Sequence, residues 1–550
     1  MLTANTRQSF QSLLDAISLN AGDDPAIIFV ATGEPPITIS RTDFVTHARH
    51  YAMALQAQDI QQNDLVIIAH AQIVESIYAF WGALLIGAVP SMFPTLTEKL
   101  DPTIYAQNLA QIVDFSDVRA IITNDDFAPN LKNIVDCPII SELPLQVTID
   151  LQTPTINPED IAFLQHSSGT TGLQKGVALS HEAVLNQLAS YSDAIALTDN
   201  DVIISWLPLY HDMGLIAGFL LPLVQGIPLV LMSPFDWVAH PALLLNAIDS
   251  YRATLCWLPN FAYNHMARRI RQRDTETLSL ASMRAFINCS EPVRDDSQQK
   301  FLDRFADCGM ASDKFSVSYA MAENTFAVTQ TPIGTYPQID IIDPITLQEE
   351  KFAKVSVDGI KIISCGFPLK NTKIQIIDDN QRQLAERHIG EILIKSDCML
   401  NSYHNRPDLE PLLGEWYKTG DMGYLAEGQL YIVGRKKDLI ITAGKNVYPQ
   451  DIEAIVNTIN GIHQGRCVVF GIPDEREGTE LIVVVAELDE QTSSEPKIIK
   501  KAIRQAITDQ STVSAKFISL VPKKWLIKTS SGKIARDANR RKWLEVFDKA

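Results

Sequence analysis

The chain has 550 residues, of which 46% are hydrophobic and 20% are charged, an ordinary globular composition with material for more than one core. Its formal net charge of −18 at pH 7 argues against general nucleic-acid binding through phosphate neutralisation. The seven cysteines lack metal-ligand spacing, and the N-terminus lacks a secretory signal, so we expect a cytoplasmic protein with reduced thiols.

Short β-rich runs alternate with amphipathic stretches along most of the chain. We expect buried strands at Leu65–His70, Ala120–Asn124 and Ala253–Leu258. The stretches His240–Arg252 and Asp295–Asp307 have the spacing of amphipathic helices. Alternation of this kind favours α/β layers with mostly parallel sheets.

Two long apolar stretches, Ile77–Pro94 and Leu215–Met232, are candidates for membrane spans. Proline and glycine interrupt both of them, so a buried helix followed by a buried strand is favoured in each case. We therefore expect no transmembrane segment.

The composition of the sequence and its pattern of expected elements change near residues 434–438. A strand pair at Arg466–Gly471 and Glu480–Glu487 and a helix at Pro496–Asp509 are expected after this point. From Val521 to Ala550, nine Lys/Arg stand against three Asp/Glu. We predict an N-terminal domain over residues 1–436 and a small α+β C-terminal domain over residues 437–550.

A loop rich in glycine and hydroxyl residues, QHSSGTTGLQKGV, runs from Gln165 to Val177. It is not a Walker A motif, because the residue five positions after Gly169 is Gln174 and not glycine. Glycines nevertheless let backbone amides converge on an anion, so a phosphate-binding loop and a flexible surface turn both stay open. The candidate phosphate ligands are Ser167, Ser168, Gly169, Thr170, Thr171, Gly172 and Lys175.

Further segments follow this loop in a fixed order: SYAMAENT (Ser318–Thr325), YKTGDMGY (Tyr417–Tyr424), GRKKDLIITAGKNVYPQDIE (Gly434–Glu453) and KTSSGKIAR (Lys528–Arg536). With the loop, they resemble the motifs of the adenylate-forming superfamily of acyl-CoA synthetases, fatty-acyl-AMP ligases, peptide-synthetase adenylation domains and luciferases. The resemblance covers essentially the whole chain. It implies a large N-terminal α/β region of two mixed sheets plus a β-rich subdomain, followed by a small mobile C-terminal domain.

The resemblance also implies a reaction. A carboxylate attacks the α-phosphate of ATP, pyrophosphate leaves, and an acyl-AMP remains. The loop would hold the β- and γ-phosphates, and Mg²⁺ bridging them is expected, with Glu323 as a protein ligand and Thr170 nearby. Carboxylate and hydroxyl oxygens suit such a hard cation.

The adenosine end of the nucleotide is expected at a second group of residues. Asp421 would accept hydrogen bonds from the ribose hydroxyls, with Arg435 beside it. Tyr319 would stack on adenine. The other nucleotide-binding candidates are Ser318, Ala320, Met321 and Asn324 in the same motif as Tyr319, and Cys289, Ser290 and Glu291 on the opposite wall.

Lys533 is the main catalytic candidate, since an ammonium at the α-phosphate would offset charge that develops in the transition state. One more surface lysine in a basic stretch is the alternative. Lys437 falls at the family's hinge position, about which the small domain would rotate between adenylation and thioester formation. His211, next to Asp212, would line the carboxylate end of the acyl pocket, with a purely structural histidine as the alternative.

Several segments resemble the fatty-acyl-AMP ligase branch, which passes acyl groups to carrier-protein phosphopantetheine and not to free CoA. They include LYHDMGLIAGF after Pro208, MSPF at Met232–Phe235 and NCSEPV at Asn288–Val293. Residues 338–362 resemble an insertion that is thought to hinder the use of CoA in this branch. We therefore expect a ligase that loads a fatty acid onto an acyl carrier protein. A fatty acyl- or aryl-CoA ligase and a non-catalytic nucleotide-binding protein are the alternatives.

Overall fold

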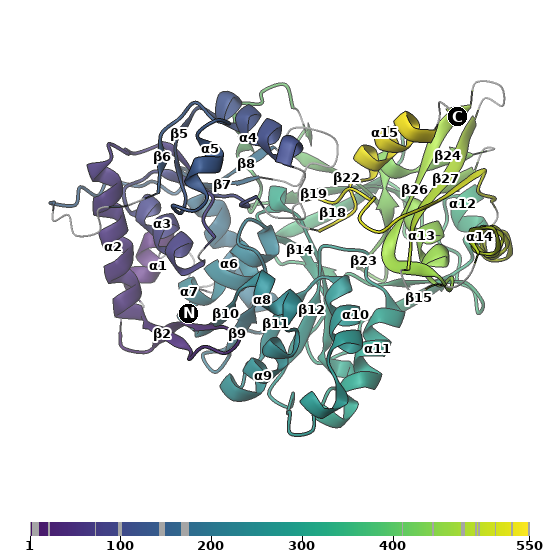
Figure 1. Ribbon diagram of the computed structural model, residues 1–550, viewed down its shortest axis with the longest axis horizontal. Coiled ribbons are helices and arrows are strands. Elements are labelled where there is room, and N and C mark those ends of the chain that lie inside the picture. Colours follow the sequence, from purple (N-terminus) through teal and green to yellow (C-terminus); the bar gives the residue numbers. More distant parts are fainter. Residues whose placement is uncertain are drawn as a thin grey trace.

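The computed structural model describes residues 2, 10–19, 22–71, 73–96, 102–141, 143, 149–166, 175–409, 411–442, 445–474, 479–489, 492, 495–511, 513–529 and 532–547. A large N-terminal part fills most of the view in Figure 1, and a smaller C-terminal part lies against one side of it. In the described part of the chain, no helix is long and apolar enough to cross a membrane.

A nine-stranded mixed sheet forms the centre of the large part. Its order is β17-β14-β13-β12-β11-β9-β10-β1-β2, parallel from β13 to β1 and antiparallel at both edges. The central strands are continuous apolar runs, as expected where both faces of a sheet are buried. The strands are β1 Pro25–Val30, β2 Ile37–Ser40, β9 Ile203–Ser205, β10 Leu229–Met232, β11 Leu255–Leu258, β12 Ala285–Asn288, β13 Phe315–Ala320, β14 Ala327–Gln330 and β17 Phe367–Pro368.

Two smaller sheets complete the N-terminal α/β region. One is parallel, with the order β4-β3-β5-β6, and the other is antiparallel, with the order β20-β8-β7. The strands predicted at Leu65–His70 and Ala120–Asn124 are confirmed as β3 and β5. The strands are β3 Leu65–Ile68, β4 Val89–Met92, β5 Val118–Ile122, β6 Ile139–Ile140, β7 Ile161–His166, β8 Gly176–Ser180 and β20 Ser402–Tyr403.

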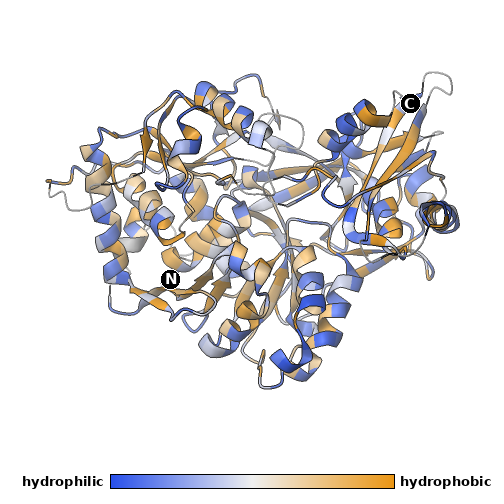
Figure 2. Ribbon diagram, viewed as in Figure 1, coloured by the Kyte–Doolittle hydropathy of each residue, from blue (hydrophilic) through white to orange (hydrophobic). Residues whose placement is uncertain are grey.

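Helices pack around these sheets, and Figure 2 shows apolar residues gathered on the strands while the outer helices carry most of the hydrophilic ones. Both long apolar stretches are a helix followed by a strand, as expected: α3 leads to β4, and η2 with α7 leads to β10. The helices are α1 Leu13–Leu19, α2 Arg41–Ala57, α3 Ile73–Leu85, α4 Pro102–Ser116, α5 Ala128–Leu131, α6 His181–Ala194, the π-helix η2 Met213–Leu220, α7 Leu221–Gln225, α8 Pro234–Ala239, α9 Ala242–Tyr251, α10 Asn260–Arg269, α11 Asp295–Phe305, and the 3₁₀ turns η3 Gln272–Asp274, η4 Ala306–Cys308 and η5 Ser312–Lys314.

A β-rich subdomain follows the central sheet. Its strands have the order β18-β19-β22-β21, and β23 pairs with β22. The predicted insertion near residues 338–362 is a hairpin, β15–β16, with the helix α12 between its strands. The elements are β15 Ile339–Ile342, α12 Pro344–Glu349, β16 Ile360–Ile363, β18 Thr372–Ile377, β19 Gly390–Ser396, β21 Leu412–Leu413, β22 Trp416–Ala426 and β23 Gln429–Arg435.

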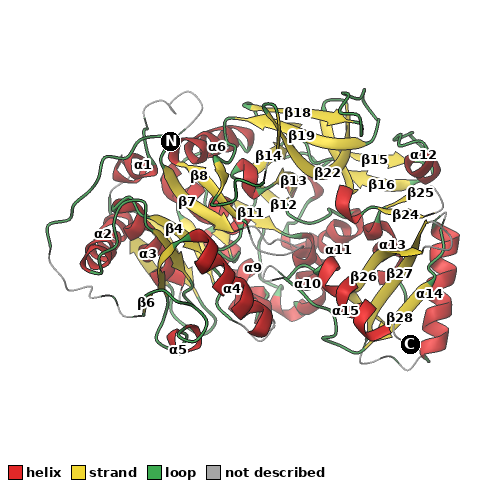
Figure 3. Ribbon diagram, turned by 90° about the horizontal axis from the view of Figure 1, so that it is seen from above, coloured by secondary structure: helices red, strands yellow, loops and turns green. Residues whose placement is uncertain are grey.

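The C-terminal part has its own core around the sheet β26-β27-β28. The isoleucines of α14, spaced four residues apart, pack on one face of this sheet, and Trp543 of α15 packs on the other, an arrangement that Figure 3 shows from above. The predicted strand pair and helix are confirmed, whereas β28, α13 and α15 were not predicted. The elements are β24 Ile440–Thr442, β25 Lys445–Val447, α13 Pro449–Asn457, β26 Ile462–Asp474, β27 Thr479–Leu488, α14 Pro496–Gln510, β28 Phe517–Val521 and α15 Arg536–Phe547.

Candidate active site

The predicted phosphate loop connects β7 and β8, which pair antiparallel from Ile161 to Ser180. Both strands are buried, so the two ends of the connection are held firmly. The loop residues themselves lie outside the described residues, so the roles of Ser167, Ser168, Gly169, Thr170, Thr171 and Gly172 stay predictions. Lys175, the last residue before β8, is described.

Lys175 and Glu323 both contact one tyrosine, Tyr403. Glu323 lies in the 3₁₀ turn η6, Ala322–Asn324, directly after β13. The Tyr403 hydroxyl donates to the Glu323 carboxylate at 3.0 Å and lies 2.9 Å from the Tyr417 hydroxyl. The Lys175 ammonium lies 4.7 Å from the centre of the Tyr403 ring, within the range of a cation–π interaction.

The Glu323 site has the chemistry of a magnesium ligand. Tyr403 uses Oε1 of the carboxylate, and within the described part of the chain Oε2 has no hydrogen-bond partner. The described residues contain no group of three or more His, Cys, Asp or Glu side chains that could hold a metal. A cation beside Glu323 would therefore take its other ligands from phosphate and water, as Mg²⁺ usually does.

Three predicted nucleotide-binding residues converge at Asp421. Its carboxylate accepts a hydrogen bond from the Tyr319 hydroxyl at 2.6 Å and pairs with the Arg435 guanidinium at 3.0 Å. Asp421 and Arg435 are cross-strand partners on β22 and β23, which keeps the two side chains close together. Asp421 is buried, and its charge raises the pKa of Arg435. Tyr319 and Arg435 thus contact both oxygens of the Asp421 carboxylate, and the ribose role of Asp421 and the stacking role of Tyr319 stay predictions.

The loop after β12 carries the other predicted wall. Cys289 is buried, and burial raises the pKa of its thiol to about 12. Ser290 has φ of +70°, an uncommon conformation for a residue with a side chain. Glu291 accepts a hydrogen bond from the Phe261 amide at 2.9 Å, which ties this loop to α10.

The remaining motif residues shape the turn after β13. The Ser318 hydroxyl donates to the Thr329 carbonyl at 2.9 Å, and the Asn324 amide donates to the Ala327 carbonyl at 2.8 Å. Both side chains are buried. Ser318 and Ala320 belong to β13, and Met321 follows it. Their contribution to nucleotide binding stays a prediction.

His211 and Asp212 form a pair that Lys533 approaches from the C-terminal part. His211 Nδ1 lies 2.5 Å from Asp212 Oδ1, and Asp212 also accepts a hydrogen bond from the Met213 amide at 2.8 Å. Burial raises the pKa of Asp212, but its contact with His211, the charge of Lys533 and the hydrogen bond from Met213 together leave the pKa below its ordinary value. Lys533 thus acts electrostatically on the carboxylate that His211 contacts.

A tight turn presents Lys533. The Thr529 amide donates to the Lys533 carbonyl at 2.8 Å, and Gly532 has φ of +84°, which favours glycine. Lys533 is also close enough to Cys289 to influence its thiol electrostatically. The charge of this lysine from the C-terminal part therefore reaches the loop after β12 in the N-terminal part.

The predicted hinge lies between these two parts. Lys437 is in the 3₁₀ turn η7, Lys436–Asp438, where burial lowers its pKa. Lys436 bonds to Glu391 of the β-rich subdomain at 3.0 Å, whereas Asp438 lies 3.6 Å from Arg536 at the start of α15. The turn is thus anchored to the N-terminal part before Lys437 and to the C-terminal part after it.

Sequence reasoning missed Tyr403, Tyr417 and the role of Asp212 beside Lys533. Tyr417 opens the segment YKTGDMGY, so its position next to a predicted ligand was a usable signal. Tyr403 comes from SYHN, which shows no phosphate-binding pattern. Only the pairing of β20 with β8 brings it to the site.

Most of the described candidate residues thus lie in or after parallel strands of the central sheet, on β22 and β23 of the β-rich subdomain, and, for Lys533, in the C-terminal part. The sequence matches the AMP-binding enzyme family over residues 15–404. The chain therefore belongs to the AMP-binding enzyme family and is an acyl-AMP-forming ligase.

Individual relatives and structures agree with this family. The medium-chain-fatty-acid–acyl-carrier-protein ligase JamA of Moorena producens is 29% identical across 98% of this chain and 96% of its own length. A putative acyl-CoA synthetase of Caulobacter vibrioides is 32% identical across 74% of this chain and 72% of its own. A solved structure from a study of fatty acyl-adenylate ligases of E. coli and L. pneumophila has a TM-score of 0.88 and 26% identity, covering 98% of both chains.

Proposed function

We propose that this protein is a fatty-acyl-AMP ligase. It would activate a fatty acid with ATP and Mg²⁺ to acyl-AMP and pyrophosphate, and then load the acyl group onto the phosphopantetheine of an acyl carrier protein. The main support is the hairpin β15–β16 with α12, which contacts the C-terminal part. The relative JamA is named as a ligase of this kind.

The adenylation step follows from the residues around the site. A carboxylate oxygen of the fatty acid attacks the α-phosphorus, and the bond to the bridging oxygen of pyrophosphate breaks. Lys533 would offset the charge that develops there, since a preorganised ammonium acts without reorganisation during the reaction. Asp421 and Arg435 would hold the ribose, and Lys175 the pyrophosphate end.

Glu323 would hold Mg²⁺, which supplies neutralisation of the phosphate charge when it is bound. His211 would orient the fatty-acid carboxylate, with Asp212 fixing its ring. These roles depend on alignment more than on covalent participation, because holding the reactants in place removes a large part of the activation barrier. In the second step, the carrier thiol attacks the acyl carbonyl, AMP leaves, and the thiol proton passes to solvent.

The insertion, which resembles the one thought to hinder the use of CoA, contacts both parts of the molecule. Asp340 of β15 pairs with Arg387 at 2.9 Å and accepts a hydrogen bond from Tyr424 at 2.7 Å, which fastens the hairpin to the β-rich subdomain. On its other side, Lys445 of β25 lies 3.3 Å from Glu349 at the end of α12. Rotation of a C-terminal domain, which we propose to be residues 437–550, about Lys437 has to break this contact.

Charge also favours a carrier protein, since acyl carrier proteins are acidic. Residues 437–550 hold 18 Lys/Arg against 15 Asp/Glu, whereas residues 1–436 hold 29 against 50. An acidic partner is therefore repelled by the N-terminal region and attracted by the net positive C-terminal one. We expect acyl transfer to the carrier to slow as ionic strength rises, while acyl-AMP formation changes little.

A product assay by mass spectrometry tests the proposal. The protein receives ATP, Mg²⁺ and a panel of fatty acids, with no acceptor, with CoA, or with holo acyl carrier protein. We expect acyl-AMP that moves to the carrier but not to CoA. Ready formation of acyl-CoA would support the alternative, a fatty acyl-CoA ligase, which the C. vibrioides relative's name favours.

A further inference from the structure

A short segment joins two parts of the candidate site that are distant in sequence. Residues 398–404, here called the strap, cross from the Glu323 turn to the end of the phosphate loop. At one end, the Leu400 amide donates to the Glu323 carbonyl at 2.8 Å, and the Thr325 hydroxyl donates to the Cys398 carbonyl at 2.8 Å. The strap is thus fastened to the turn that carries the predicted metal ligand.

The other end of the strap is fastened to the strand that follows the loop. Tyr403 pairs with Val177 across β20 and β8, and the His404 amide donates to the Gly176 carbonyl at 2.8 Å. Gly176 directly follows Lys175. The backbone at Tyr403 is therefore held in register with the exit of the phosphate loop, and it cannot shift without breaking this ladder.

The side chain of Tyr403 uses this position to contact both charged candidates. Its hydroxyl lies between the Glu323 carboxylate and the Tyr417 hydroxyl, and its ring faces the Lys175 ammonium. Burial raises the pKa of both tyrosines, so each keeps its proton at neutral pH. A neutral Tyr403 has one proton and donates it to the carboxylate, and Tyr417 then donates to Tyr403.

We propose that Tyr403 is a positioning residue that orients Glu323 toward the metal and Lys175 toward the phosphates, with Tyr417 as its support. The hydroxyl binds Oε1 and leaves Oε2 available to a cation, while the ring restricts the flexible lysine without removing its charge. Tyr403 thereby links two groups that would both act on one metal–triphosphate unit. This inference rests on the proposed adenylation function.

A positioning role and a purely structural role make different predictions. If Tyr403 only braces the strap, its hydroxyl contributes to stability and affects nucleotide binding equally with and without metal. If it orients Glu323, loss of the hydroxyl weakens binding only where the metal takes part. Tyr403→Phe separates the two, since it keeps the ring over Lys175.

A matched control lies outside the site. The Tyr336 hydroxyl donates to the Asp295 carboxylate at 2.9 Å, so Tyr336→Phe removes the same kind of tyrosine–carboxylate bond elsewhere in the large part. Calorimetry measures ATP binding to the wild type and both variants, in Mg²⁺ and in EDTA. A hydrogen bond to a charged group suggests a loss of about 10-fold.

We expect Tyr403→Phe to weaken ATP binding about 10-fold in Mg²⁺, with binding in EDTA unchanged, and Tyr336→Phe to match the wild type in both conditions. Tyr403→Leu, which also removes the ring from Lys175, should weaken ATP binding in EDTA as well. Equal affinities of Tyr403→Phe and wild type for ATP in Mg²⁺ would overturn the inference. A wild type that binds ATP equally with and without Mg²⁺ would overturn it too, by removing the proposed metal role itself.

Discussion

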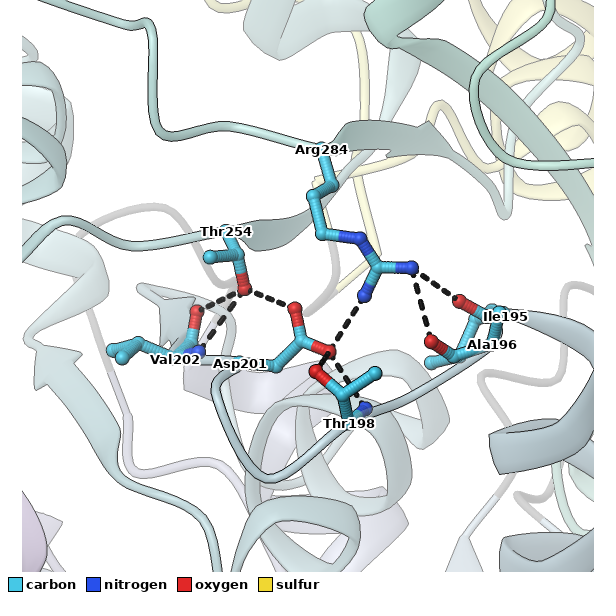
Figure 4. Close-up of polar contacts among 7 residues, drawn as sticks. All are labelled: Ile195, Ala196, Thr198, Asp201, Val202, Thr254 and Arg284. Atoms are coloured by element: carbon cyan, nitrogen blue, oxygen red, sulfur yellow. Dashed lines mark hydrogen bonds and ion pairs between the residues drawn. The ribbon is translucent and has the colours of Figure 1, made fainter.

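Two carboxylate sites lie at opposite ends of parallel strands in the central sheet. At the amino ends of β9, β11 and β12, the buried Asp201 is held by Thr198, Thr254 and Arg284, as Figure 4 shows. Thr254 donates to Oδ1 at 2.7 Å, and Arg284 binds Oδ2 at 2.6 Å. At the carboxyl end of β13, in contrast, Glu323 has one described partner, Tyr403, on one of its two oxygens.

The difference distinguishes a carboxylate that stabilises the fold from one that is available to a ligand. Asp201 also accepts hydrogen bonds from the amide and the hydroxyl of Thr198. The second guanidinium nitrogen of Arg284 donates to the carbonyls of Ile195 and Ala196. Such a closed network ties the α6–β9 connection to β12 and has nothing to offer a ligand. At the other end, one oxygen of Glu323 has no partner among the described residues and is an acceptor that a ligand could use.

We expect the largest effect on activity from a substitution of Lys533. We expect Lys533→Ala to lower acyl-AMP formation by about 10²–10³-fold, because it removes charge stabilisation at the α-phosphate, while ATP binding survives. Pyrophosphate release measures the first effect and equilibrium ATP binding the second. Lys516→Ala, an exposed lysine on the same C-terminal part, is the control. Near-wild-type adenylation by Lys533→Ala would refute the assignment.

Arg284→Met should break the closed cluster. Its removal leaves the buried Asp201 charge without its guanidinium, so we expect the free energy of unfolding to fall by about 3 kcal/mol. Urea unfolding measures this loss, and adenylation per folded molecule should stay unchanged. A variant as stable as the wild type would show that the cluster does not support the fold.

Glu323→Gln should lower activity and leave stability nearly unchanged, the reverse of Arg284→Met. The amide keeps the size of the side chain and its bond from Tyr403 but weakens a hard-cation site. We expect adenylation to fall about 100-fold, as for loss of one preorganised electrostatic group, and the melting temperature to change little. Raising Mg²⁺ should recover part of the activity. A large loss of stability with unchanged activity would reverse the contrast with Asp201.

The smallest effect concerns pH and the contact between the two parts. Burial raises the pKa of Asp451 in α13 to about 7, and the neighbouring charge of Arg294 only partly opposes this. A raised carboxyl pKa adds stability that is fully present below about pH 4 and is lost as pH rises through 7. The melting temperature should therefore fall between pH 5 and 8, and fall less in Asp451→Asn. An equal fall in both proteins would contradict this role.

Local patterns predicted much of the fold. Apolar runs bounded by polar turns identified β3, β5, β11 and β27, because a strand buried on both faces needs a continuous apolar sequence. The helical spacing of Ile499, Ile503 and Ile507 identified α14 for the same kind of reason. A two-residue strand such as β20 is too short to have a hydrophobic pattern of its own. It forms only because a neighbouring strand supplies its hydrogen-bond partners.

The sequence by itself determined the class of enzyme, since the segments that hold Glu323, Asp421, Arg435 and Lys533 together resemble the motifs of the adenylate-forming superfamily. It also predicted a domain boundary near residue 437, where the pattern and charge change. Only the tertiary structure decided that Tyr403 joins Glu323 to Lys175, and that the charge of Lys533 acts on Asp212. These pairs are far apart along the chain, and their distance is set by sheet order and domain contact, which no local pattern encodes.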